Sequence, residues 1–236
     1  MEITIKCPDC GKELKVSIEE ATTVASKAVL TKKQEETVSW EEIAERIHAG
    51  AENAIEVGDE IACTLKDGTE VVFVAAAINP YAENEVAFVI KDCLPDLHNM
   101  NDDCTNEGGW RNSGMREYVN GKIYDLLPDD LKAVIKERTI IQKQDDEELS
   151  SADKLWLLSR TEVTGTDYET DFNDVHFPLF KDERSRVKQV DGETYWYWLR
   201  SPYASSSSHF CIVSNYGNAN YNGAHNSGGV AFGFLI

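Results

Sequence analysis

The sequence predicts an α+β fold of small, mixed antiparallel sheets with two or more helices, preceded by a short N-terminal tail. Three observations support this fold class. The chain has 236 residues, of which 42% are hydrophobic, which is enough to bury one full core. Short β-prone runs bounded by turn residues recur along the chain, and capped helical patterns lie between them. We therefore expect a tail and linker over residues 1–37 and a main domain over residues 38–236.

The charge balance limits the classes of partner. Lys and Arg number 23 against 42 Asp and Glu, so the formal net charge is -19. Such a chain repels phosphate backbones and anionic lipid surfaces, which argues against a nucleic-acid partner. It has no apolar run of membrane-spanning length and no N-terminal export signal. We expect no membrane insertion and a cytoplasmic protein, which could still reach a phage particle or a cell surface by a non-standard route.

The N-terminal tail contains one motif with metal-ligand spacing. The Cys7-x-x-Cys10 pair resembles one knuckle of a zinc ribbon, because two thiolates at this spacing can chelate one ion. A closed zinc site needs four ligands, and the sequence has no second pair of this kind. Three alternatives remain open: two chains share a metal in a homo-oligomer formed through this segment, His48 or a lone cysteine completes the site, or the knuckle is a remnant. We expect the remaining cysteines to be free thiols, and these are Cys63, Cys93, Cys104 and Cys211.

The main domain opens with a helix signal. Ser39 with Glu42 three residues later predicts a capped helix that ends at Gly50. An Asp67-Gly68 turn then predicts a β-hairpin. Further strands are expected over residues 86–90, 139–142, 156–159, 195–199 and 230–236, and further helices after Ser113 and at Pro128. Residues 145–148 are predicted as an exposed acidic loop, and residues 160–194 as a long polar insertion.

The loop over residues 99–110 is rich in oxygen ligands, so we considered calcium. Cys104 stands where an EF-hand loop requires glycine, and Trp110 stands where it requires a bidentate glutamate. We therefore reject an EF-hand. We expect a structural loop whose Trp110 packs into the core, and a looser calcium site is the alternative.

The last part of the chain, residues 201–236, contains no Asp, Glu, Lys or Arg. Tyrosine offers a large, rigid contact area, while Ser, Asn and Gly offer adaptable hydrogen bonds, and selected binding loops use this mixture. The alternative is a pair of hairpin turns with no binding role. We expect a display surface because the segment is long, uncharged and interleaved with tyrosines. The candidate ligand-binding residues are Tyr203, Ser206, Ser208, His209, Asn215, Tyr216, Asn218, Asn220, Tyr221, Asn222, His225 and Asn226.

Four motifs occur in a fixed order along the main domain, and they carry a family resemblance. These are GGW at residues 108–110, MREY at 115–118, LWLLS at 155–159 and WLRSP at 198–202. Together with the Ser/Asn/Tyr-rich segment, they resemble an uncharacterised domain family of gut bacteria and their phages. Members of that family are similar to the variable proteins of diversity-generating retroelements. The resemblance covers residues 38–236 and implies a C-type-lectin-like fold.

In such variable proteins, an error-prone reverse transcriptase rewrites adenines near the end of the gene. The resemblance implies that all the candidate residues from Ser206 onward belong to the set that altered Asn codons can encode. Residues 210, 212 and 213 would then belong to the fixed strand that carries them. The chain departs from the family pattern at residues 231–234, where many members have Arg and Pro after Gly-Val.

We predict a binding protein for a protein or glycan ligand, and not an enzyme. A structural or assembly protein of a phage or bacterial particle is the first alternative. The second is a formylglycine-generating-like enzyme. Such enzymes use a cysteine near the substrate groove, and Cys211 is the only candidate near that end of the domain. Cys211 lies in an apolar run, and the chain has no Gly-x-Ser-x-Gly motif. We expect no catalytic residues, and no cofactor other than zinc at Cys7 and Cys10.

Overall fold

The computed structural model describes residues 2–6, 13–17, 38–144 and 147–236. The chain divides into two compact units, Met1–Val38 and Ser39–Ile236. In the first unit, β1 (Glu2–Lys6) and β2 (Glu13–Ser17) form an antiparallel pair. Cys7 and Cys10 lie outside the described residues, so the zinc knuckle stays a prediction.

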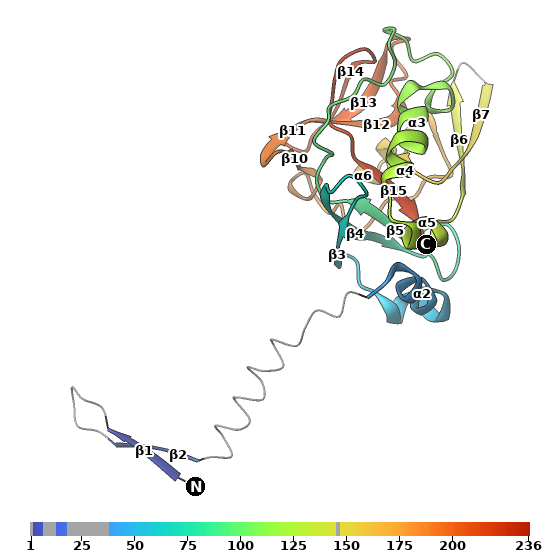
Figure 1. Cartoon of the computed structure of the whole chain (residues 1–236). Coiled ribbons are helices and arrows are strands. Elements are labelled where there is room, and N and C mark those ends of the chain that lie inside the picture. The colour runs from blue at the N-terminus through green and yellow to red at the C-terminus, as the bar shows by residue number, and fades with distance from the viewer. Residues whose placement is uncertain (1, 7–12, 18–37, 145–146) are drawn as a thin grey trace. The chain divides into compact units, whose positions relative to one another are not determined.

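The second unit is an α+β domain with small antiparallel sheets and a few helices, and this confirms the predicted class (Figure 1). Its helical segments are α2 (Trp40–Ala54), η1 (Trp110–Asn112), α3 (Gly114–Tyr118), η2 (Val119–Ile123), α4 (Tyr124–Leu126), α5 (Asp129–Val134), α6 (Arg160–Thr164) and η3 (Arg184–Arg186).

Four sheets contain the described strands of this unit, and neighbouring strands in each are antiparallel. The largest has the order β3 (Glu60–Thr64), β4 (Glu70–Ile78), β5 (Val86–Ile90), β15 (Phe232–Leu235) and β8 (Trp156–Leu157). A three-stranded sheet has the order β7 (Glu147–Asp153), β6 (Arg138–Gln144) and β9 (Asp171–Phe172). Another has the order β12 (Tyr197–Pro202), β13 (His209–Val213) and β14 (Ala219–Gly223), and a separate hairpin joins β10 (Lys188–Val190) and β11 (Glu193–Tyr195).

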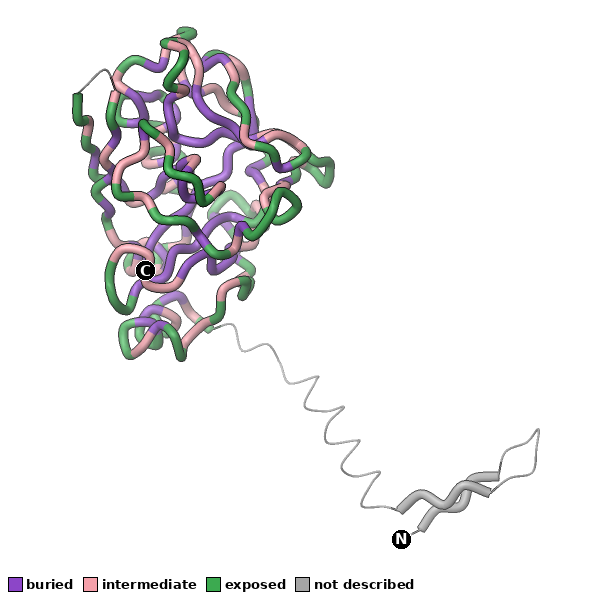
Figure 2. Tube along the Cα trace, turned by 180° about the vertical axis from the view of Figure 1, so that it is seen from behind, coloured by how far each residue is buried: buried purple, intermediate pink, exposed green. Residues whose placement is uncertain are grey.

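The C-terminal strand β15 lies between β5 and β8 and forms the centre of the core. All its residues are buried, as the apolar run predicted. Gly233 permits a close approach to β5, because a Cβ there would lie 2.8 Å from the Phe88 carbonyl oxygen. The Phe234 ring packs edge-on against Phe73 at 5.0 Å and against Trp40 of α2 at 5.8 Å. The end of the chain therefore joins the first helix of the domain to its largest sheet, and buried residues run through the interior (Figure 2).

Local signals located several elements correctly. The Ser39 hydroxyl accepts a hydrogen bond from the Glu42 amide at 3.2 Å, which confirms the predicted cap of α2. The predicted hairpin at Gly68 is confirmed by β3 and β4, and Gly68 has a φ of 89°. The Ser113 cap is also confirmed, because its hydroxyl accepts from the Arg116 amide. Trp110 is completely buried, as expected for a structural loop.

Two predicted boundaries were wrong. The α2 helix does not end at Gly50: the backbone departs from helical angles there, with a φ of 153°, and helical structure continues to Ala54. The predicted acidic loop over residues 145–148 was also wrong, because β7 begins at Glu147; residues 145–146 lie outside the described ones. The β7 strand mixes exposed and buried polar residues, so it lacks the apolar alternation that reveals a strand. The strand conformation of β7 depends instead on its antiparallel pairing with β6.

Shortening Phe234 should destabilise the domain. We expect Phe234→Ala to lower the free energy of unfolding by about 3–5 kcal/mol, because it leaves a cavity among the packed rings. Urea unfolding followed by tryptophan fluorescence measures this change. Leu97→Ala, at a side chain that is 38% exposed, serves as the control and should change stability by about 0.5 kcal/mol or less. Equal effects of the two substitutions would contradict the assignment of β15 as the core strand.

Candidate functional site

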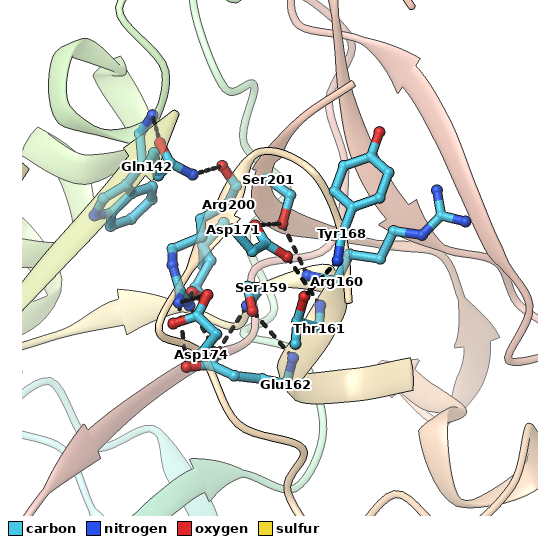
Figure 3. Close-up of polar contacts among 12 residues, drawn as sticks. Gln142, Ser159, Arg160, Thr161, Glu162, Tyr168, Asp171, Asp174, Arg200 and Ser201 are labelled. Carbon is cyan, nitrogen blue, oxygen red and sulfur yellow. Dashed lines mark hydrogen bonds and ion pairs between the residues drawn. The ribbon is translucent and has the colours of Figure 1, made fainter. Parts of the chain in front are cut away.

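A cluster of four buried charges lies beneath the uncharged segment. Arg200 on β12 is completely buried, and its two terminal nitrogens lie 2.6 Å from Glu162 Oε2 and 2.6 Å from Asp174 Oδ2. Arg138 on β6 makes the same two pairings, at 2.6 Å to Glu162 Oε1 and 2.6 Å to Asp174 Oδ1. Figure 3 shows Arg200 beside both carboxylates. We call Arg138, Glu162, Asp174 and Arg200 the four-charge cluster.

The Glu162 carboxylate accepts hydrogen bonds from both arginines of the cluster and from two further donors. Besides the two arginines, its carboxylate accepts hydrogen bonds from the Tyr81 hydroxyl at 2.6 Å and the Ser159 amide at 2.7 Å. Burial raises the pKa of Glu162, but the guanidiniums of Arg200 and Arg138 outweigh burial and hold this pKa at about 2. Glu162 is therefore ionised under all ordinary conditions, and it also completes a capping box with Ser159 at the start of α6.

Removing the Glu162 charge should destabilise the domain and change its acid sensitivity. We expect Glu162→Gln to lower the free energy of unfolding by about 3–5 kcal/mol, because two buried guanidiniums lose a partner. The pKa of Glu162 lies below its ordinary value of 4.5, so its ionic contribution is present above that pH and is lost as pH falls toward about 2. The free energy of unfolding, measured with urea between pH 7 and pH 3, should therefore fall less steeply with falling pH for Glu162→Gln than for the wild type.

The matched control is Glu193→Gln, at an exposed carboxylate on β11. It should leave both the stability at pH 7 and its acid dependence close to wild type. An acid dependence of Glu162→Gln identical to that of the wild type would contradict the pKa assignment.

Further hydrogen bonds hold the end of β12. The Gln142 side chain donates to the Arg200 carbonyl at 3.0 Å and accepts from the Trp110 amide at 2.7 Å. The Ser201 hydroxyl donates to Asp171 Oδ1 at 2.6 Å, and the Thr170 hydroxyl donates to the Pro202 carbonyl at 3.2 Å. Figure 3 shows these partners of Arg200 and Ser201 around the strand. The backbone that enters the uncharged segment is therefore fixed from several elements.

Asn106 holds the connection between β12 and β13, and we call residues 203–208 the display loop. The Asn106 side chain is 2% exposed, and it donates to the carbonyls of Ser206 at 2.7 Å and His209 at 2.8 Å. Its backbone amide donates to the Ser207 carbonyl at 2.9 Å, and Gln144 donates to its side-chain oxygen at 3.1 Å. Asn106 was not among the predicted site residues, because a single Asn in an oxygen-rich loop has no spacing pattern that indicates distant partners.

Five of the predicted ligand-binding residues come together at this loop and on the strands β13 and β14 beside it. The rings of Tyr203 and Tyr221 stack with centroids 4.1 Å apart and an interplanar angle of 17°. His209 meets Tyr221 edge-on at 5.4 Å. The hydroxyls of Ser206 and Ser208 lie 2.8 Å and 2.9 Å from His209 Nδ1. We call these five residues the tyrosine–histidine cluster.

Three other predicted residues lie at the turn between β13 and β14. Tyr216 is 75% exposed, and Asn215 and Asn218 belong to the same turn. The turn packs against Glu183: the Asn218 side-chain nitrogen donates to Glu183 Oε1 at 2.5 Å, and a Cβ on Gly217 would overlap the Glu183 carbonyl. The turn therefore holds the Tyr216 ring in solvent on a fixed backbone.

The remaining predicted residues lie on and after the edge strand β14. The side-chain oxygens of Asn220 and Asn222 accept hydrogen bonds from the amides that follow them, those of Tyr221 and Gly223. Asn222 also accepts from Asn226 at 2.8 Å, whereas His225 is exposed. Asn222 and Asn226 thus bond to each other, and Asn220 satisfies a strand-edge amide.

A polar groove of about 750 Å³ opens beside Tyr203. Its walls come from the display loop and from the ends of β6 and β7. Lining side chains include Lys143, Glu147, Glu148, Glu169, Tyr203 and Ser206. The tyrosine–histidine cluster and the groove therefore share Tyr203 and Ser206, and together they form one candidate binding surface.

The cysteines of the described residues are free thiols, as expected. Cys211 is completely buried, and burial raises its pKa to about 11, so its thiol is protonated at neutral pH. An activated nucleophile requires the opposite pKa shift. Among residues 38–144 and 147–236, no group of three or more His, Cys, Asp or Glu side chains is arranged to hold a metal ion. No helix within the described part of the chain is long and apolar enough to cross a membrane.

The structure is an α+β domain in which an uncharged, tyrosine-bearing segment lies beside a groove lined by charged residues and above a cluster of buried charges. A family model described as a domain of unknown function (DUF6273) matches residues 84–235, and the chain belongs to this family. The matched range includes the four-charge cluster and the whole display loop. Neither the curated proteins nor the solved structures gave a match.

Removing the Asn106 side chain should loosen the display loop. In Asn106→Ala, two carbonyl oxygens lose their donor, and we expect a loss of about 1–3 kcal/mol of local stability. Amide hydrogen exchange, resolved by peptide, should become faster over residues 203–209. Asn218→Ala is the control, because it removes an exposed amide from another loop. Unchanged exchange over residues 203–209 in Asn106→Ala would contradict the clamping role.

Proposed function

We propose that this protein binds a protein or glycan ligand through the tyrosine–histidine cluster and Tyr216. The observation that carries the proposal is the position of the aromatic rings. Tyr221 is 47% exposed and stacks on Tyr203, and Tyr203 lines a polar groove on the display loop that Asn106 holds. Exposed aromatic side chains on a fixed backbone lose little entropy on binding, and they are frequent energetic anchors of interfaces.

The remainder of the surface supports recognition by hydrogen bonding. The hydroxyls of Ser206 and Ser208 and the exposed Asn220 side chain are uncharged groups that can donate or accept. A ligand with many polar groups, such as a protein loop or an oligosaccharide, can satisfy them. The buried Cys211 thiol offers no comparable support for a catalytic role.

The finer proposal is a C-type-lectin-like variable protein whose display segment is diversified. The exposure of Tyr216, Asn218, Asn220, Tyr221 and His225 supports it, because diversification is useful only at positions that reach a ligand. Sequencing around the gene tests this proposal. We expect a near-copy of its 3′ end, with Asn codons at the candidate positions, beside a reverse-transcriptase gene. Without that arrangement, the protein is a non-diversified member of its family.

Alanine substitutions test the binding surface itself. We expect Tyr221→Ala and Tyr216→Ala each to weaken ligand binding by about 1–3 kcal/mol, because each removes an aromatic anchor. Screening the purified protein on oligosaccharide and protein arrays identifies a ligand, and titration calorimetry then measures the affinity of each variant. Tyr195→Ala is the matched control, because Tyr195 is half-buried on the separate β10–β11 hairpin. A ligand that binds both variants as tightly as the wild type would show that the surface is wrongly assigned.

A further inference from the structure

Arg160 is a fixed guanidinium at the border of the candidate surface. It is the first residue of α6, and its backbone amide donates to the Ser201 hydroxyl at 2.8 Å. Its guanidinium carbon lies 4.5 Å from the centroid of the Tyr168 ring. Figure 3 shows Arg160 and Tyr168 on the side of the site away from Asp174. Stacking on an aromatic ring restricts the orientation of the guanidinium plane.

The guanidinium of Arg160 has no oxygen partner within the described parts of the domain. No carboxylate of residues 38–144 or 147–236 lies within 4.0 Å of it, and none of their oxygen atoms accepts a hydrogen bond from it. Its nitrogens are also not among the buried atoms that lack a partner in this part of the chain. Arg138 and Arg200, by contrast, each bind two carboxylates. The N–H donors of the Arg160 guanidinium that bind no oxygen within these residues are therefore available to a ligand.

Tyr168 connects Arg160 to the display loop. The Tyr168 amide donates to the Thr161 hydroxyl at 3.1 Å, and its own hydroxyl accepts from the Ala204 amide at 3.1 Å. Ala204 follows Tyr203 directly in the display loop. The Tyr203 ring in turn stacks on Tyr221, with centroids 4.1 Å apart. Arg160 therefore lies beside the loop that carries one of the two stacked tyrosines.

We infer that Arg160 binds a carboxylate of the ligand, namely an Asp or Glu side chain of a protein partner that contacts Tyr221. This inference rests on the proposed binding function and assigns a charge to its ligand. A guanidinium matches a carboxylate through two parallel hydrogen bonds, which provide both affinity and orientation. The acidic residue lies at the edge of the interface, beside the aromatic anchors.

Two features favour a protein over an acidic sugar. The exposed tyrosines are spread over a turn and a strand, which fits a broad protein surface better than one sugar ring. Tyr203 and Tyr221 also cover one face of each other, so fewer ring faces remain for stacking on a sugar. Salt screens the distant charges of the chain, whose net charge is -19, beyond about 8 Å at physiological ionic strength. We therefore expect the acidic residue of the partner at Arg160 and not in the groove, which Glu147, Glu148 and Glu169 line.

Peptide selection tests the inference. Random peptides are displayed on phage, and the full chain is the immobilised target. We expect the selected peptides to carry Asp or Glu at one shared position. A synthetic peptide from this set should lose about tenfold or more in affinity for Arg160→Gln, which corresponds to about 1.4 kcal/mol. Arg160→Lys should retain part of the affinity, and Arg111→Gln, at an exposed arginine on η1, should bind like the wild type.

A double-mutant cycle separates direct contact from an indirect effect on the fold. Replacing the acidic residue of the peptide by its amide should weaken binding to the wild type but not to Arg160→Gln. A purely structural role of Arg160 would give additive losses and would overturn the inference. Thermal unfolding of Arg160→Gln establishes that the variant used in the cycle is folded.

The remaining outcomes distinguish the inference from the proposed function. Peptides that depend on Tyr221 but not on Arg160 would overturn the inference and leave the proposed function standing. Peptides that depend on neither residue would overturn both. If acidic oligosaccharides bind on an array and no peptide is selected, the inference that the partner is a protein is overturned.

Discussion

The buried pairing of Arg138 and Arg200 with Glu162 and Asp174 is the interaction on which the rest of the domain depends. Each arginine contacts both carboxylates, so no charge of the cluster remains unpaired. The cluster joins β6, α6, β12 and the segment that follows β9. A buried ion network contributes less net stability than its short distances suggest, because desolvation opposes the attraction. We expect its main effect to be on specificity, since other packings of these elements would leave a charge buried without a partner.

This specificity extends to the surface through β12. Arg200 fixes the middle of the strand, and the contacts of Ser201 and Pro202 fix its end. Asn106 then holds the display loop, which begins directly after Pro202. A surface fixed in this way does not have to be ordered when a ligand binds, so less interaction energy offsets lost conformational entropy. The buried charges and the exposed tyrosines are therefore parts of one arrangement.

Local sequence signals predicted the elements that depend on local physics. The Ser39 cap, the Gly68 turn and the apolar run of β15 are specified by neighbours within a few residues. The four-charge cluster could not be predicted, because the partners of Glu162 lie 24 and 38 residues away in the sequence. In the sequence, Glu162 is only one acidic residue of the predicted polar insertion over residues 160–194. Composition likewise indicated the uncharged residues 201–236 as a candidate surface, but it could not predict the Tyr203–Tyr221 stack. That stack depends on the pairing register of β13 and β14.

The absence of charge over residues 201–236 has two separate physical origins. Residues 228–236 are buried, and an unpaired charge there would carry a large desolvation cost. Residues 203–227 include many exposed positions, such as Tyr216 and His225, where burial does not exclude a charge. Burial therefore does not explain neutrality in this second part. The proposed binding role would explain it, because a charged side chain in the centre of an interface must be desolvated or paired.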